Sequence, residues 1–455
     1  MKQNSTSIVI LISDQWNRIS SWFHDGVFRH MFLNAGKLLS ANTLAAFIGL
    51  TVVALIARAL GPKNYGVLVL VLIYEQSIGK LVTFNAWQAI IKYGSEALHK
   101  EDSSGLKKLI KFGFSLDISS AFFGTILAMV LSGPVISLLG WDQSVRSLLV
   151  LISILILFSL NGTPIGILRL FDRFDLLSYS AVINTLARLG GVAWCLLTKQ
   201  GLFGFVLVYL ITGIVGQLYQ VFASLWVLRQ HHLAGFFFLP LRGFRHKFPN
   251  ILAYVWTTNV HSTVRMLSRE ADGLIIAGLT TPEALGIFKI AKQFSRALQM
   301  LSNPLYQSIY PELSRLLATG KKKAFRSLIK RSSLLIGTIS VCGWLIFILL
   351  GNWLIVRIVG SVYQDSYWIA VWYMLALVIA TITFSFHPSM LALGLPLTSF
   401  KILAFATLVY FALLVPLVSI IGIIGASLSY IAFYLVWSIT MFIYLRPQLY
   451  QSQSH

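Results

Sequence analysis

Basic side chains recur at helical spacing within stretches that are otherwise apolar. The longest series, in residues 285–309, consists of Lys289, Lys292, Arg296, Gln299 and Asn303. Steps of three and four residues place the whole series on one face of a helix. Ammonium and guanidinium groups suit phosphate and pyrophosphate, Lys as a point charge and Arg through paired hydrogen bonds. The series therefore indicates a binding site for an anionic ligand.

The composition identifies the stretches around these residues as membrane spans. Hydrophobic residues make up 57% of the chain and charged residues only 11%, a composition that does not describe a soluble domain. Apolar runs of about 20 residues recur along the chain, each long enough to cross a bilayer as a helix. The sequence therefore predicts an all-α polytopic membrane protein.

We expect about twelve transmembrane helices in two pseudo-symmetric six-helix lobes around a central cavity. The spans are residues 38–60, 67–91, 109–132, 147–168, 178–198, 204–228, 250–270, 285–309, 332–350, 368–391, 401–421 and 425–445. The lobes then cover 38–228 and 250–445, joined by a basic cytoplasmic linker, 229–249. Residues 446–455 form a cytoplasmic tail. Residues 1–37 are either a helix in the cytoplasmic interface or a disordered tail.

Further cations lie inside or at the end of other predicted spans. They are Lys80, Arg188, which follows the polar Asn184 by one helical turn, and Arg265, with the neutral Asn259 on the same helix face as Arg265, and Arg58 at the end of the first span. Arg58 is either a ligand of the same cavity or an interfacial anchor. Arg188 equally fits a bridge between helices through backbone carbonyls. Lys289, one turn from a span end, equally fits a side chain that reaches the membrane interface.

The intramembrane cations lack a matching set of acids. On insertion scales each cation costs about 2.5–3.5 kcal/mol, and together they would cost roughly 15–20 kcal/mol without compensation. A cavity rich in Lys and Arg but poor in acid selects an anionic cargo. Glu75 and Asp117 lie within spans. They either couple transport to a proton or sodium gradient or the membrane potential, or neutralise Lys80 or another cation.

The net charge of +21 allows two interpretations, nucleic-acid binding or membrane topology. About four times as many Lys and Arg fall in the termini and loops on one side of the predicted spans as on the other. The rich side includes Lys107, Lys108, Lys111, Arg242 and Lys247. This bias predicts that both termini are cytoplasmic, and it explains the charge without nucleic acid as a partner.

The chain contains a weak internal repeat. Ile56–Gly66 is a short polar turn after the first apolar run, and Ile276–Gly286 repeats its outline without a gap. Ile, Ala, Pro and Gly coincide between the two stretches. We interpret them as equivalent periplasmic hairpins, each leading into a helix that carries intramembrane charge.

Motifs typical of enzymes are absent from the sequence. It contains no GxxxxGK[ST] phosphate loop, no HExxH and no glycine-rich dinucleotide turn. Cys195 and Cys342 lie in apolar runs without a CxxC motif, which predicts small buried hydrophobic residues. We therefore expect no catalytic residues, no metal site and no cofactor.

Five short motifs, in the right order, resemble those of polysaccharide transporters and O-antigen flippases. They are Ala57–Gly66, Arg169–Phe174, Asp272–Ile276, Pro282–Gly286 and Tyr310–Arg315. These families belong to the multidrug/oligosaccharidyl-lipid/polysaccharide exporter superfamily. The resemblance covers roughly residues 38–445 and departs from the family at the N-terminal extension and in the small number of acids.

The resemblance implies two six-helix lobes with alternating access in the bacterial inner membrane. The implied cargo is an undecaprenyl-pyrophosphate-linked oligosaccharide, flipped from the cytoplasmic to the periplasmic leaflet. Cationic cavity residues would meet the pyrophosphate, and Arg265, Lys292 and Arg296 are the positions we select. Implied partners are membrane lipids, a polysaccharide polymerase and a chain-length regulator.

Two alternatives remain from the sequence. A multidrug exporter of the same superfamily would need acidic cavity residues for cationic drugs, and such residues are scarce here. A membrane-embedded polysaccharide polymerase would need a large outer loop with a catalytic acid or Arg pair, and no predicted outer loop is large.

Overall fold

The computed structural model describes residues 26–84, 86–160 and 162–450. It describes all of their side chains except those of residues 26–47, 245, 260–271, 297, 300–308 and 448–450. The predicted interfacial segment therefore lies mostly outside the described residues. The described chain is helical throughout, and no strand occurs within it.

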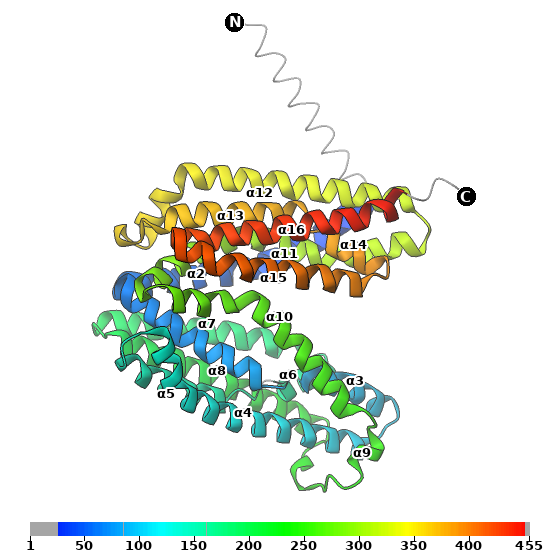
Figure 1. The fold of residues 1–455 in the computed structure, drawn as a ribbon. Helices are drawn as coiled ribbons and strands as arrows, with labels where there is room; N and C mark the ends of the chain where they lie inside the picture. The colour runs from blue at the N-terminus through cyan, green and yellow to red at the C-terminus, as the bar shows by residue number, and fades with distance from the viewer. Residues whose placement is uncertain (1–25, 85, 161, 451–455) are drawn as a thin grey trace, which may run out of the picture. The chain divides into compact units, whose positions relative to one another are not determined.

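Helices follow one another along the chain with short connections (Figure 1). The first group is α2 (Gly26–Val82), α3 (Ala86–His99), α4 (Ser103–Leu139), α5 (Ser144–Leu157), α6 (Gly162–Leu170), α7 (Phe174–Leu197) and α8 (Leu202–Gln230). Two short elements, η1 (Phe236–Phe238) and α9 (Phe244–Lys247), lie in the linker. The rest are α10 (Ile251–Leu279), α11 (Pro282–Ala318), α12 (Lys322–Ile358), η2 (Ser361–Tyr363), α13 (Ser366–Ile382), α14 (Phe386–Ala392), α15 (Pro396–Ile421) and α16 (Ile424–Tyr450).

Each of the twelve predicted spans falls on one of these helices or on a consecutive pair. Within the described residues, nine helical stretches are long and apolar enough to cross a membrane. The first of them, Ile48–His99, contains the second predicted span and the end of the first. Neither α10 nor α11 is among the nine, because these two helices carry the polar faces that the sequence predicts. The predicted fold class is confirmed.

Helix contacts form two compact units. One comprises Ile48–Lys289, and the other comprises the described parts of Met1–Phe47 and Ile290–His455. Both α2 and α11 therefore contribute to each unit. In the first unit, α10 packs on α3 and α4. In the second, α16 packs on both α13 and α15. The predicted lobe boundaries, 38–228 and 250–445, stay a prediction.

Three predicted spans are interrupted rather than continuous. The second is divided between α2 and α3, the fourth between α5 and α6, and the tenth between α13 and α14. Buried polar side chains lie at the tenth-span interruption, where the hydroxyls of Ser333 and Ser385 are 2.7 Å apart and those of Thr383 and Ser438 are 2.8 Å apart. Such bonds help to satisfy polar groups at membrane depth.

The two repeated turns have different backbones. In the first, Gly61 has φ 69° and ψ 170° inside α2, and Pro62 begins the next helical segment. Only glycine adopts this conformation without steric cost. In the second, α10 ends at Leu279, Pro282 begins α11, and the Thr281 hydroxyl accepts a hydrogen bond from the Ala284 amide at 3.3 Å. A Thr cap with a following Pro is a typical helix start.

The repeated glycines lie against each other within the unit of residues 48–289. A methyl group on Gly66 would overlap the Pro282 carbonyl and lie 3.1 Å from the Gly286 nitrogen. A methyl group on Gly286 would overlap the Pro62 carbonyl and lie 3.1 Å from the Gly66 nitrogen. The two turns therefore make a reciprocal backbone contact that only glycine permits at both positions.

Candidate functional site

Two residues of α11 next to its predicted polar series pack on neighbouring helices. Phe294 and Ser295 are buried: the Phe294 ring lies 6.2 Å from that of Phe347 on α12, and the Ser295 hydroxyl donates to the Ala370 carbonyl of α13 at 3.5 Å. The predicted ligands on this helix with described side chains are all half-buried: Lys289, Lys292, Arg296 and Gln299. Asn303 is on α11, but its side chain lies outside the described residues.

Residues of α10 belong to the unit of residues 48–289. Asn259 is buried, and its Oδ1 atom has no hydrogen-bond partner among the described residues. A buried polar atom of this kind is costly unless a ligand or water satisfies it. Arg265 lies two turns further along α10, and its side chain is outside the described residues.

The structure brings Glu75, Lys80 and Arg188 into one electrostatic group. Glu75 on α2 is buried, and the charges that act on it are those of Lys80 and Arg188. Lys80, in the last turn of α2, is itself exposed. The arrangement fits the alternative in which Glu75 neutralises nearby cations.

Arg188 also contacts an aromatic ring. Its guanidinium carbon lies 4.4 Å from the ring centroid of Tyr209 on α8, a cation–π distance. Its Nε atom is buried and lacks a hydrogen-bond partner within the described part of the chain. Arg188 thus bridges α7 and α8, although by a ring contact, whereas the sequence-based alternative was a bridge through backbone carbonyls.

A polar seam between α7 and α8 extends from Arg188. The Asn184 amide donates to the Thr212 carbonyl at 3.2 Å, and the Gln220 amide donates to the Ser180 hydroxyl at 3.2 Å. Sequence reasoning found Asn184 and Arg188 but missed Ser180 and Gln220. Ser180 precedes Asn184 by four residues, so the same helical spacing could have found it.

Asp117 caps a helix inside the span region. It is fully buried on α4, and its Oδ2 atom accepts a hydrogen bond from the Thr163 amide at 2.6 Å, in the first turn of α6. Its Oδ1 atom has no hydrogen-bond partner among the residues described. A methyl group on Gly162 would lie 2.6 Å from Oδ1 and 3.0 Å from the Phe84 carbonyl, between α2 and α3. Asp117 therefore lies where two interrupted spans meet.

The structure also gives the exposure of Arg58 and of the two cysteines. Arg58 is exposed, three residues before Gly61 in α2. Cys195 is buried as predicted, but Cys342 on α12 is exposed, so that prediction was wrong. An apolar run predicts burial in membrane or protein without distinguishing them, which explains the error. In the described part of the chain, no group of three or more His, Cys, Asp or Glu could hold a metal ion.

Residues 32–317 match the model of a family described as polysaccharide biosynthesis protein. The chain belongs to this family. It is also 30% identical, over 352 residues, to the inner membrane protein YghQ of Escherichia coli (strain K12), an alignment that covers 77% of this chain and 98% of YghQ. The predicted family is confirmed, and the chain is a multi-pass inner membrane protein.

Solved structures of two transport proteins share the fold. An inward-facing MATE-family multidrug resistance transporter of the MOP superfamily superposes with a TM-score of 0.72 at 13% identity, covering 90% of this chain and 96% of that one. The lipid II flippase MurJ, in an inward closed conformation, gives 0.70 at 16% identity, covering 90% and 87%. These likenesses show that the chain has the same fold as these two proteins.

Proposed function

We propose that this transporter flips an undecaprenyl-pyrophosphate-linked oligosaccharide from the cytoplasmic to the periplasmic leaflet for surface polysaccharide synthesis. Family membership supports a role in polysaccharide biosynthesis, and the fold is one that a lipid flippase also uses. Alternating access between two helical units is the transport cycle we assign to it. The protein itself catalyses no bond-forming or bond-breaking step in this proposal.

The observation that carries the proposal is the cationic face of α11. Lys292 and Arg296 are half-buried within a predicted membrane span, whereas Phe294 and Ser295 of the same helix contact α12 and α13. Guanidinium and ammonium groups at membrane depth favour a ligand with concentrated negative charge. Pyrophosphate has that chemistry. Arg265, Arg188, Lys80, Lys289 and Arg58 are the further cations that we propose for the transport path.

We propose that both termini are cytoplasmic, on the basis of the Lys and Arg distribution between loops. The lipid carrier and the surrounding phospholipids are then the direct contacts of the protein. A polysaccharide polymerase and a chain-length regulator would act on the flipped product at the periplasmic face.

Energy for net movement would come from a proton or sodium gradient or from the membrane potential, with Glu75 and Asp117 as candidate coupling residues. Both are buried acids within helices that we assign to spans. Glu75 is electrostatically linked to Lys80 and Arg188, so a change in its charge would alter a cationic group. A rate of lipid flipping in vesicles that does not depend on pH, sodium or membrane potential would exclude this role.

Alanine substitution of the α11 cations tests the proposal in cells. Lys292→Ala and Arg296→Ala should each abolish surface polysaccharide at native expression, with lipid-linked oligosaccharide accumulating in the cytoplasmic leaflet. The measurement is polysaccharide display together with leaflet-specific labelling of the lipid-linked precursor. Lys323→Ala, an exposed position at the start of α12, is the matched control and should have no effect. Normal polysaccharide from both α11 variants would remove this site assignment.

A further inference from the structure

The linker between α8 and α10 is held firmly against α4. The Lys111 ammonium donates to the carbonyls of Phe237 and Leu239, at 2.7 and 2.8 Å, and the Lys108 ammonium donates to the Arg242 carbonyl at 3.0 Å. The ring of Phe244 also stacks on that of Phe112, with centroids 4.6 Å apart. Lysines that the sequence explains by topology alone therefore also position the linker.

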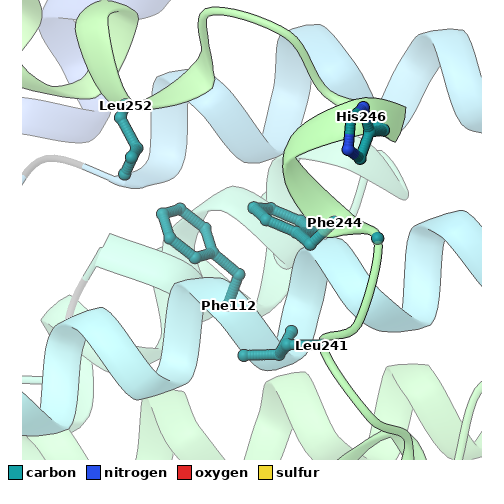
Figure 2. Close-up of a pocket in the computed structure, with 6 residues that line it drawn as sticks. Phe112, Leu241, Phe244, His246 and Leu252 are labelled. Carbon is teal, nitrogen blue, oxygen red and sulfur yellow. The ribbon is translucent and has the colours of Figure 1, made fainter.

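This arrangement leaves a pocket of 450 Å³ between α4, the linker and the start of α10. Its lining residues are Phe112, Leu241, Gly243, Phe244, His246 and Leu252. Figure 2 shows the Phe112 and Phe244 rings next to each other, with Leu241 and Leu252 on either side of them. The volume lies within the range of small-ligand sites. The walls are mainly apolar, and Leu252 is 45% exposed at the edge.

Basic residues of the linker lie in and next to the lining of this apolar pocket. His246 is the ionisable residue of the lining, and Arg242, next to two lining residues in sequence, is exposed. Lys247 lies beside His246 and forms an ion pair with Asp102 at 2.6 Å. The described surroundings thus combine apolar walls with excess basic charge, which is complementary to an amphiphile whose head group is anionic.

An aromatic residue of the same linker is poised to enter a membrane interface. Phe238 of η1 is 93% exposed, directly beside the two carbonyls that Lys111 binds. Full exposure of a Phe to water is costly, whereas aromatic and basic residues together are typical of segments at the lipid head groups. The linker therefore fits a position at the membrane surface, where phospholipid is the abundant amphiphile.

We propose that this pocket binds an anionic phospholipid of the adjacent leaflet. An acyl chain lies against Phe112, Phe244 and Leu252, and the phosphate contacts His246 and Arg242. The site goes beyond oligosaccharide flipping, because it takes a bilayer lipid at the linker rather than the transported cargo at the α11 face. Its presence or absence leaves the flippase proposal unchanged.

Lipid-dependent quenching tests this site. The cysteine-free variant (Cys195→Ala and Cys342→Ala) with Leu252→Cys carries a bimane label and is placed in phosphatidylcholine vesicles with increasing amounts of brominated phosphatidylglycerol. A control protein carries the same label at Phe238→Cys. The amount of phosphatidylglycerol that gives half-maximal quenching should be about fivefold lower for the label at position 252 than for the label at position 238. A difference of this size is typical of one basic residue near anionic lipid. Brominated phosphatidylcholine should quench both positions equally.

Removal of the basic groups supplies the second measurement. The double substitution Arg242→Gln and His246→Gln should raise the fraction of phosphatidylglycerol needed for half-maximal quenching at position 252 about fivefold or more. It should leave that fraction unchanged at position 238. Native mass spectrometry of the unlabelled protein should then show one fewer bound phosphatidylglycerol, whereas Lys323→Gln should retain it. Equal quenching by brominated phosphatidylglycerol at the two positions would overturn the proposal, as would bound lipid that is unaffected by the double substitution. The pocket would then be a candidate binding surface for a protein.

Discussion

At the scale of single residues, Asp102 makes two contacts at once. Its Oδ1 atom accepts a hydrogen bond from the Gly105 amide at 2.9 Å, which caps α4, and its Oδ2 atom pairs with Lys247 of the linker at 2.6 Å. The Lys247 hydrogen bond, followed by that of Gly105, lowers the pKa of the Asp102 carboxyl from its ordinary value. One side chain therefore starts a helix and holds the linker beside it.

Two substitutions separate these roles. Asp102→Asn keeps a good cap and loses the charge pair, so it should destabilise the protein by about 0.2–1 kcal/mol. Asp102→Ala loses the cap as well, which should add about 1 kcal/mol. Thermal unfolding gives the total effect, and hydrogen exchange of the amides in 241–250 reports the linker. Exchange that is identical in all three proteins would contradict the linker contact.

The same pair has a definite pH dependence. Because the pKa of Asp102 is lowered in the folded state, its stabilisation is fully present above the unfolded-state pKa and is lost as pH falls through the folded-state pKa. The difference in stability between wild type and Asp102→Asn should therefore stay constant from neutral to mildly acidic pH and disappear only in strong acid. A difference that already vanishes near pH 6 would assign the effect to another group.

At the scale of elements, helical periodicity and apolar run length were enough to predict the spans and the polar face of α11. Both signals arise from residues that are close together in the chain, so a single sequence is enough to reveal them. The interruptions between α5 and α6 and between α13 and α14 were not predicted, because their residues remain apolar enough to continue a span. They depend on partners from other helices, such as Asp117 for Thr163.

The candidate site was predictable to a similar degree. Arg188 and Asn184 were identified by their spacing, but the ring of Tyr209 and the amide of Gln220 come from α8, so sequence spacing on α7 cannot reveal them. The contacts of Lys108 and Lys111 with the linker had no local signal either. The sequence explained both lysines fully by topology, which concealed their second role.

The reciprocal glycine contact between the repeated turns gives a prediction for an element. Gly66→Ala and Gly286→Ala each place a methyl group on backbone of the opposite turn, and overpacking of this kind costs about 1–3 kcal/mol or more. Thermal unfolding of the purified protein should show both variants destabilised. Gly190→Ala, on α7 with open space around it, is the control and should be neutral or stabilise by up to about 1 kcal/mol. Equal stability of the three variants would contradict the contact.

At the scale of the whole molecule, the chain combines a family fold with an unusual balance of charge. The fold alone is shared with a multidrug transporter and a lipid flippase, so it does not select a cargo. In the function we propose, the charges do: Lys292 and Arg296 are half-buried on α11, whereas Phe294 and Ser295 of the same helix contact α12 and α13. A negatively charged cargo is therefore the central claim of the function that we propose.

The most direct measurement is flipping of purified undecaprenyl-pyrophosphate-linked oligosaccharide in vesicles that contain only this protein, followed by access of a membrane-impermeant lectin. Wild-type protein should move the lipid, and Arg296→Ala should slow it about tenfold or more, as expected for the loss of a charge-assisted contact. Arg315→Ala should flip normally, because Arg315 lies on the same helix and pairs with Glu312 at 2.9 Å. Lipid movement equal to that in protein-free vesicles, or transport of a cationic drug instead, would contradict the account.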